Sequence, residues 1–507
     1  MKHDGVHTGR TAASPPGERG LWNAFARSVL FNLQAEMVAN LIRVGGVIFL
    51  ARMLEPRDFG LLRILIVLGA IAALIGTGGL PEALIQRKEL LTEHQTTAWW
   101  LTVMCAGTAV ALLFVAAPLL ERFMAMAGLG RMIRLICIPI FIEGTSMVPN
   151  ALLQRALRYD ALAAADIIAE GGFLVSAVTV LYLGFPRLSL PCGLAARATL
   201  RGLTTWVAAG FVPRAAPRLR AARDLWPFAI GVLGGQTLVI ASQNADYVMV
   251  GRLLGGRALG YYSMAWDLLR FIPERLHRVV GRVTLPAFSA IQEQRAQLAR
   301  HYRALIAMVG RLVLPAMALL AIAAPKLIAV IYGAKWMPAA LPLRLLTPGL
   351  ALVGLRLAIG SIYYARGWPA LDIVLHGLRL IAIVTAILLL APLGLAAVCA
   401  GMSAVEGVVS VAGQWMVCRL IKLSPASLAA STLPGLRTAV ACSLAALAGA
   451  ALFGGLFVSA TPASRCLALV LMLAPATAVF GWQERRTARS LLRGGDLISS
   501  TAEAFGA

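Results

Sequence analysis

The ten residues ARMLEPRDFG (51–60) have a counterpart in GRLLGGRALG (251–260), so one landmark occurs twice in this chain. Other pairs keep the same order and a similar offset of about 200 residues. Leu-Pro at 80–81 recurs at 285–286 with Ile-Gln following in both copies, and GLAA at 193–196 recurs at 394–397. In an apolar chain, a duplication of this length predicts a transporter built from two homologous lobes around a shared cavity.

The composition indicates a membrane protein. Hydrophobic residues make up 59% of the 507 residues, charged residues only 14%, and the mean hydropathy is +0.79. A soluble chain of this size needs more charge to cover its surface, whereas repeated apolar runs of about 20 residues predict membrane-spanning helices. The seven cysteines show no CxxC or Cys/His spacing, so we expect neither a disulfide framework nor a metal site.

The strongly basic balance has two possible explanations. The formal net charge is +23, which in a soluble chain would favour nucleic acid as a partner. No basic block is interleaved with aromatic residues, and basic loops that face anionic lipids are common in membrane proteins. We therefore expect membrane lipids, and not nucleic acid, as the partner of these charges.

We count about fourteen apolar segments long enough to cross a bilayer. The first six form one repeat, the next six form the other, and the last two lie outside the duplication. Because each repeat has an even number of spans, both copies enter the membrane from the same side, which makes them parallel repeats. The expected fold is an all-α membrane protein with two parallel six-helix repeats and two further C-terminal helices.

Loop charge sets the expected orientation, because basic residues are enriched in cytoplasmic loops. One side of the predicted topology carries about twice as many arginines and lysines as the other, so we assign it, and both termini, to the cytoplasm. The opposite, periplasmic side includes Arg52, Arg57, Arg131, Arg252, Arg257, Lys335 and Arg465. The expected divisions are a cytoplasmic tail (1–27), an N-lobe (28–213), a basic linker (214–226), a C-lobe (227–418), a second linker (419–436), two last spans (437–482) and a cytoplasmic tail (483–507).

Ionisable residues inside predicted spans mark candidate sites, because a charge in the bilayer needs a partner or an aqueous cavity. In the first span, Glu36, Asn40 and Arg43 follow the spacing of one helical face. In the fifth, Asp166 and Glu170 are four apart, and such a carboxylate pair is a candidate for binding H⁺ or Na⁺.

The sixth span carries Arg197 and Arg201, also four apart. A count of depth along the two helices brings Glu170 and Arg201 together near mid-membrane. Two interpretations stay open: a structural Glu170–Arg201 salt bridge, or a site in which these groups contact the substrate or an ion.

The second repeat keeps the scaffold but changes the charges. Its counterpart of the fifth span carries Asp372, His376 and Arg379 on one face, and the partner span offers Glu406 with no arginine. This is the pattern expected if the two walls of a cavity do different jobs. Sequence drift in which each charged residue keeps a local partner of opposite charge would produce a similar pattern.

The eighth span carries Arg270, Glu274 and Arg278 at i, i+4 and i+8, with Asp267 three residues before Arg270. They indicate either an ion-paired helix that continues into the cytoplasm beyond Pro273, or a cationic stripe that receives an anionic head group. Arginines slightly outnumber carboxylates among the intramembrane charges, which favours an anionic substrate. The candidate substrate-binding residues are Arg43, Arg197, Arg201, Arg270, Arg275, Arg356 and Arg379, and the candidate ion-coupling residues are Glu36, Asp166, Glu170, Asp267 and Asp372.

Seven short motifs stand out along the chain: LEPRDFG (54–60), ALIQRK (83–88), ALLQR (151–155), QNADY (243–247), ALGYY (258–262), RVTLPAFS (282–289) and GAKW (333–336). As a set they resemble the polysaccharide transporter (Wzx-type oligosaccharide flippase) family, especially its exopolysaccharide-export branch. The resemblance covers residues 25 to 425. It implies membership of the multidrug/oligosaccharidyl-lipid/polysaccharide exporter superfamily, whose two six-helix bundles form a V-shaped cavity.

The resemblance also implies a function, an environment and partners. The expected substrate is an undecaprenyl-pyrophosphate-linked oligosaccharide, moved across the bacterial inner membrane by alternating access, with cavity arginines receiving the pyrophosphate. No cofactor is expected apart from a coupling H⁺ or Na⁺, and polymerase or export machinery is a possible partner. The alternatives are efflux of small cationic compounds on the same scaffold and a membrane glycosyltransferase or polymerase; the latter usually needs a large polar loop, which this sequence lacks.

Overall fold

The computed structural model describes residues 18–87, 90–213, 216–453 and 462–494. Within these ranges the chain consists of helices and short connections, without a β-strand. The expected all-helical architecture is therefore confirmed for the described residues. Helix α1 already begins at Glu18, inside the stretch expected to be an N-terminal tail, and α16 continues to Gly494. The remainder of both expected tails, residues 1–17 and 495–507, lies outside the described residues.

The elements follow one another with short connections. In chain order they are α1 (Glu18–Met53), α2 (Pro56–Thr77), α3 (Leu80–Gln86), α4 (Thr92–Met124), α5 (Leu129–Thr145), α6 (Met147–Arg155), α7 (Tyr159–Tyr182), α8 (Pro186–Ala209), α9 (Leu219–Ala290), α10 (Arg295–Ile331), η1 (Ala334–Ala339), α11 (Ala340–Leu355), α12 (Ile359–Ala365), α13 (Ala370–Leu390), η2 (Ala391–Leu393), α14 (Leu395–Ile421), α15 (Pro425–Phe453) and α16 (Pro462–Gly494).

Twelve segments of the described chain are long and apolar enough to cross a membrane. One of them, Leu219–His277, is 59 residues long and contains a break: Gly255 has φ 84° and ψ 170°, so two helices meet there. Glycine suits this position because it adopts positive φ without steric cost. Helix α8 is not among the twelve, although it has 24 residues. Arg197 and Arg201 stand within it and make it less apolar.

The repeated decapeptide lies at the start of α2, and its residues explain why a helix begins there. Pro56 occupies the first turn, where its missing N–H leaves no hydrogen bond unmade. The backbone N–H of Glu55 donates to the Asp58 carboxylate at 3.2 Å, which satisfies an amide that the helix cannot pair. The helix ends at Gly78, which takes the left-handed conformation with φ 57°.

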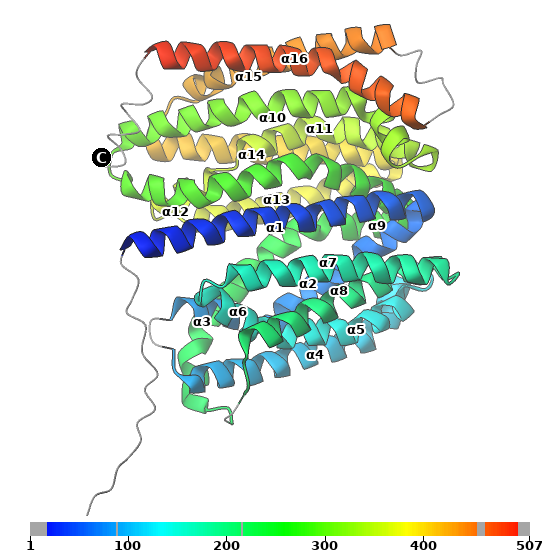
Figure 1. The fold of residues 1–507 in the computed structure, drawn as a ribbon, viewed down its shortest axis with the longest axis vertical. Helices are drawn as coiled ribbons and strands as arrows, with labels where there is room; N and C mark the ends of the chain where they lie inside the picture. Colours follow the sequence, from blue (N-terminus) through cyan, green and yellow to red (C-terminus); the bar gives the residue numbers. More distant parts are fainter. Residues whose placement is uncertain (1–17, 88–89, 214–215, 454–461, 495–507) are drawn as a thin grey trace, which may run out of the picture.

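Figure 1 shows two groups of helices with α1 between them. In the first group, α7 packs on α1 and α8, α5 on α4 and α8, and α2 on α4. In the second, α14 packs on α11 and α13, and α10 on α11. Helix α9 contacts both groups, including α2 on one side and α11 and α13 on the other. The last two helices lie at the outer edge, where α15 covers α10 and α16 packs on α15 (Figure 1).

The two groups touch closely where the copies of the decapeptide meet. A Cβ at Gly60 of α2 would overlap the carbonyl oxygen of Gly256 in α9, and a Cβ at Gly260 of α9 would overlap the carbonyl oxygen of Pro56. Each copy thus supplies one glycine that admits the backbone of the other. This reciprocal approach requires glycine at both positions, because any side chain would push the helices apart.

Aromatic packing extends this contact toward η1. Trp336 is fully buried, its ring lies edge-on to Phe59 with centroids 5.2 Å apart, and its indole N–H donates to the Ala51 carbonyl oxygen at 2.7 Å. The Lys335 ammonium donates to the Arg52 carbonyl oxygen at 2.8 Å. We call this region the closed end. It consists of the end of α1, the start of α2, the start of the second half of α9, and η1.

Candidate functional site

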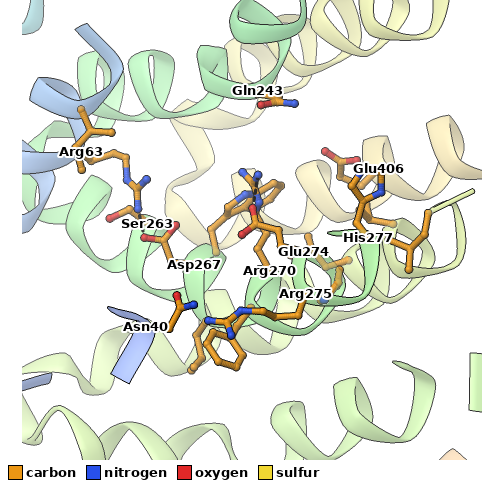
Figure 2. Close-up of a pocket in the computed structure, with 18 of the residues that line it drawn as sticks. Asn40, Arg63, Gln243, Ser263, Asp267, Arg270, Glu274, Arg275, His277 and Glu406 are labelled. Atoms are coloured by element: carbon orange, nitrogen blue, oxygen red, sulfur yellow. Dashed lines mark hydrogen bonds and ion pairs between the residues drawn. The ribbon is translucent and has the colours of Figure 1, made fainter. Parts of the chain in front are cut away.

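A cavity of about 1310 Å³ lies between the two groups of helices (Figure 2). Its walls come from α1, α2, α7 and α8 on one side and from α11, α12, α13 and α14 on the other, while α9 contributes along its length. The lining begins beside the closed end, at Phe59 and Tyr332. Along α9 it continues from Ser263 to Leu285, about 33 Å of helix at a rise of 1.5 Å per residue.

The charged lining is rich in arginine. The arginines are Arg43, Arg63, Arg197, Arg270, Arg275, Arg356 and Arg379, and the carboxylates are Glu170, Asp267, Glu274, Asp372 and Glu406. Among the described lining residues, seven arginines against five carboxylates leave two positive charges in excess. Six of the seven arginines expected from the sequence therefore line one cavity, as do three of the five expected carboxylates.

On the first wall, two arginines share one buried carboxylate. Glu170 of α7 is buried, and its Oε1 accepts from Arg43 of α1, with Nη2 at 2.6 Å and Nε at 3.0 Å. Arg197 of α8 lies 3.7 Å from the same oxygen. The side chains of Arg43 and Arg197 remain 50% and 40% exposed, so both guanidinium groups still face the cavity. One positive charge of this cluster is not neutralised.

The second wall repeats this arrangement with different residues. Glu406 of α14 is buried, and its Oε1 accepts from Arg379 of α13, with Nη2 at 2.5 Å and Nε at 2.8 Å. Its other oxygen accepts from Nη2 of Arg356 at 3.2 Å. Arg379 also donates to the carbonyl oxygen of Ser242 in α9, which fixes the guanidinium between α13 and α9. Again two arginines surround one buried glutamate.

Between the walls, α9 places a row of charges along the cavity (Figure 2). Arg270 pairs with Glu274 one turn further at 2.5 Å, and the Arg275 guanidinium lies over the Phe271 ring at 4.5 Å. Asp267 pairs with Arg63 of α2, which also lies over the Tyr247 ring at 4.6 Å. The eighth span is thus ion-paired and also faces the cavity, so the two interpretations offered for it are not exclusive.

Three expected site residues do not line the cavity: Glu36, Asp166 and Arg201. Arg201 pairs with Asp166 at 2.8 Å and lies 3.8 Å from Glu143 of α5. The expected Glu170–Arg201 pair is therefore wrong.

The reason is the hairpin formed by α7 and α8. These helices are antiparallel and joined by a short turn, so residues equally far from the turn face each other. Glu170 consequently meets Arg197, and Asp166, one turn further away, meets Arg201. Depth counting that ignored the turn shifted the register by one helical turn.

Two further charged positions, Arg63 and Asp246, were not predicted as site residues. Arg63 is the single charge in the apolar stretch 61–77, so the rule for ionisable residues within spans could have found it. Asp246 is fully buried in α9, where it accepts from the Tyr262 hydroxyl at 2.8 Å, while its Oδ1 has no hydrogen-bond partner among the described residues. It was noted only as part of a motif. No group of three potential metal ligands occurs in the described part of the chain.

Comparisons with known proteins agree with this architecture. The sequence pattern of the family described as "Polysaccharide biosynthesis protein" matches residues 49–341. The teichuronic acid biosynthesis protein TuaB of Bacillus subtilis is 25% identical over 362 residues, covering 68% of this chain and 72% of that protein. The lipopolysaccharide biosynthesis protein WzxC of Escherichia coli is 23% identical over 350 residues, covering 67% of each chain.

Among solved structures, the lipid II flippase MurJ in its inward closed conformation superposes with a TM-score of 0.69. It covers 92% of this chain and 100% of its own at 13% identity, a level at which the likeness establishes the fold alone. More than half of the chain matches the family pattern, and the helices of that match supply the closed end and much of the cavity. The protein is a member of the polysaccharide biosynthesis protein family.

Proposed function

We propose that this protein is a flippase that moves undecaprenyl-pyrophosphate-linked oligosaccharide repeat units across the bacterial inner membrane, for exopolysaccharide, capsule or O-antigen synthesis. The observation that carries the proposal is the charge of the described cavity lining: seven arginines, five carboxylates and an excess of two positive charges. A pyrophosphate esterified at both ends carries about two negative charges, one on each phosphate. The cavity and the head group are thus complementary in sign and magnitude.

The two Arg–Glu–Arg clusters explain how the cavity tolerates its arginines. A guanidinium left unpaired inside the membrane region is costly, and the buried glutamate at the centre of each cluster offsets most of that cost. In each cluster the glutamate neutralises one arginine, so the positive charge of the other arginine can attract a substrate phosphate. Guanidinium suits this role because its planar donors bind phosphate oxygens in pairs.

Efflux of small cations is the alternative on the same scaffold, and the charge balance argues against it. A site for cations would favour an excess of carboxylates, whereas this lining has an excess of arginines. An enzymatic role has less support, because the similar solved structure is that of a flippase, the lipid II flippase MurJ. The flippase proposal involves no covalent step.

We also propose the finer architecture: fourteen spans, arranged as two parallel six-helix repeats in an N-lobe and a C-lobe, with α15 and α16 as the additional pair. The break at Gly255 divides α9 into two spans, and α8 with 24 residues is long enough for a further one. The reciprocal contact of Gly60 and Gly260 agrees with a two-fold relation between the lobes.

The proposed orientation gives the cavity a direction. The closed end contains Arg52, Arg57, Gly256 and Lys335, which the loop-charge rule assigns to the periplasmic side. We therefore infer a V-shaped cavity closed toward the periplasm, with both termini in the cytoplasm, and alternating access by rocking of the lobes. Coupling to H⁺ or Na⁺ stays a proposal; of the expected carboxylates, Glu170, Asp267 and Asp372 line the cavity.

Two neighbouring arginines of α8 provide a test with a built-in control. Replacing Arg197 by glutamine removes a cation that faces the cavity and should weaken binding of undecaprenyl diphosphate about tenfold, the value of one charge-assisted contact. Replacing Arg201 by glutamine removes a cation of the same helix that faces Asp166 and Glu143 instead, and should leave this affinity within about twofold.

Binding would be measured with purified protein in phosphatidylcholine nanodiscs, and transport by surface-glycan production in a complemented deletion strain. Equal losses of affinity in the Arg197→Gln and Arg201→Gln proteins would show that the cavity is not the binding site. Unchanged affinity in both proteins would contradict the proposed role of the first-wall cluster.

A further inference from the structure

A second, smaller cavity of about 380 Å³ lies at the closed end. Three cations line it, each from a different element: Arg52 from α1, Lys335 from η1 and Arg465 from α16. The other lining residues are Ala329, Val330, Tyr332, Gly333 and Ala334, so no carboxylate belongs to the described lining. We call this cavity the basic pocket.

Hydrogen bonds to backbone carbonyl groups hold Arg52 and Lys335 in place. Nε of Arg52 donates to the Ile331 carbonyl oxygen at 2.8 Å, and its Nη2 donates to the Val330 carbonyl oxygen, both at the end of α10. Lys335 donates to the Arg52 carbonyl oxygen at 2.8 Å. Arg52 donates two of its five N–H groups to these carbonyl oxygens, and its other N–H groups can bind a ligand. The carboxylates of Glu55 and Asp58 act on Lys335 electrostatically but do not line the pocket.

The basic pocket and the large cavity share one side chain. Tyr332 lines both, and it packs against Trp336 with ring centroids 6.2 Å apart. Trp336 in turn packs on Phe59, which lines the large cavity. Tyr332, which packs on Trp336 and through it on Phe59, therefore lies between the two cavities. A ligand in the basic pocket would lie just beyond the closed end of the large cavity.

We propose that the basic pocket binds the phosphate of a lipid head group on the far side of the closed end. Three cations, with no carboxylate among the described residues of the pocket, favour an anion, and arginine with lysine suits phosphate oxygens. Lipid is the expected carrier of this phosphate, because α10 and α16 are membrane-spanning candidates and bring the head-group region to the pocket. This inference rests on the proposed function for its orientation, since the pocket would face the outer leaflet.

Two lipids share this chemistry: a resident anionic phospholipid, and the transported diphosphate lipid after it has crossed. The test uses phosphatidylglycerol and undecaprenyl diphosphate as probes, with purified protein in phosphatidylcholine nanodiscs. Binding at the large cavity is weakened in every protein by Arg197→Gln with Arg356→Gln, so that differences in affinity between these proteins report the basic pocket. Arg465→Gln and Lys335→Gln then remove its cations one at a time, and Arg465→Lys restores the charge.

Each removed cation should weaken phosphatidylglycerol binding about fivefold, the effect of one basic residue near an anionic lipid surface. Arg465→Lys should recover most of the affinity. Arg131→Gln is the matched control, because Arg131 is exposed at the start of α5 on the same predicted side and does not line the pocket. Competition by undecaprenyl diphosphate would identify the transported lipid as an occupant, and its absence would leave the resident phospholipid.

Equal phosphatidylglycerol affinity in the Arg465→Gln, Lys335→Gln and Arg131→Gln proteins would overturn the inference. That failure is distinct from a failure of the proposed function. The latter would appear as undiminished undecaprenyl diphosphate binding when Arg197 and Arg356 are replaced in a protein whose basic pocket already carries Arg465→Gln and Lys335→Gln.

Discussion

Replacing Glu406 by glutamine is expected to destabilise the protein by about 3–5 kcal/mol, the usual consequence of removing one partner from a buried ion pair. The Glu406 side chain is only 1% exposed and interacts with both Arg356 and Arg379. Without its charge, two guanidinium groups would remain in the wall without compensation, and Arg379 is itself buried. Thermal unfolding of the detergent-purified protein, followed by circular dichroism, would measure the loss.

Glu274 provides the control for this experiment. It also pairs with an arginine of the cavity, Arg270, but its side chain is 54% exposed. Glu274→Gln should therefore change the stability by about 1 kcal/mol or less. Adding Arg356→Gln to Glu406→Gln should recover part of the loss, because one of the two uncompensated cations is then removed. If Glu406→Gln and Glu274→Gln proteins unfolded at the same temperature, the cluster would not support the second wall.

Much of the site follows from the rule that intramembrane charges need partners. That rule selected Arg43, Arg197, Arg270, Arg356 and Arg379 from an apolar sequence, and the structure places all of them around one cavity. The helical fold was equally predictable, because apolar runs of bilayer length leave the backbone no other way to satisfy its hydrogen bonds. These features depend on local sequence, and this is why they could be predicted.

The partners of the charges could not be predicted in the same way, because they depend on how helices lie side by side. Arg43 reaches Glu170 across 127 positions of sequence, and Arg63 reaches Asp267 across 204. The exchange of partners between Arg197 and Arg201 came from the register of a single hairpin. A shift of one turn moves a side chain by about 5.4 Å, which is enough to place it in the cavity or outside it.

The duplicated decapeptide is visible in the sequence, but the reason for its repeated glycine is a tertiary contact. Both copies end in glycine, at Gly60 and Gly260. At each glycine, a backbone carbonyl group of the other copy packs where a side chain would otherwise stand. Sequence alone shows that glycine recurs there, but not which backbone approaches it. The structure thus explains why glycine recurs in both copies: the two copies pack against each other, a contact that neither copy could make alone.

Replacing Gly60 or Gly260 by alanine is expected to prevent the two lobes from meeting at the closed end. The new methyl group would overlap a backbone carbonyl oxygen, which cannot move aside as a flexible side chain can. Overpacking of this kind costs about 3 kcal/mol, which would lower the population of the closed form about 100-fold. Because transport requires both ends to open in turn, surface-glycan production should fall with it.

The rearrangement can be followed by labelling Ser263→Cys, a cavity position beside the closed end, in a protein whose seven native cysteines are replaced by serine. A membrane-impermeant maleimide added from the periplasmic side should label it faster in the Gly60→Ala and Gly260→Ala proteins. Gly256→Ala is the matched control, since its methyl group would meet Arg57 Cγ at an ordinary 3.4 Å. Because the two glycines make reciprocal contacts, labelling that rises in only one of the two variants would contradict a symmetric closed end, and labelling that rises equally in the Gly256→Ala protein would contradict the role of the backbone contact.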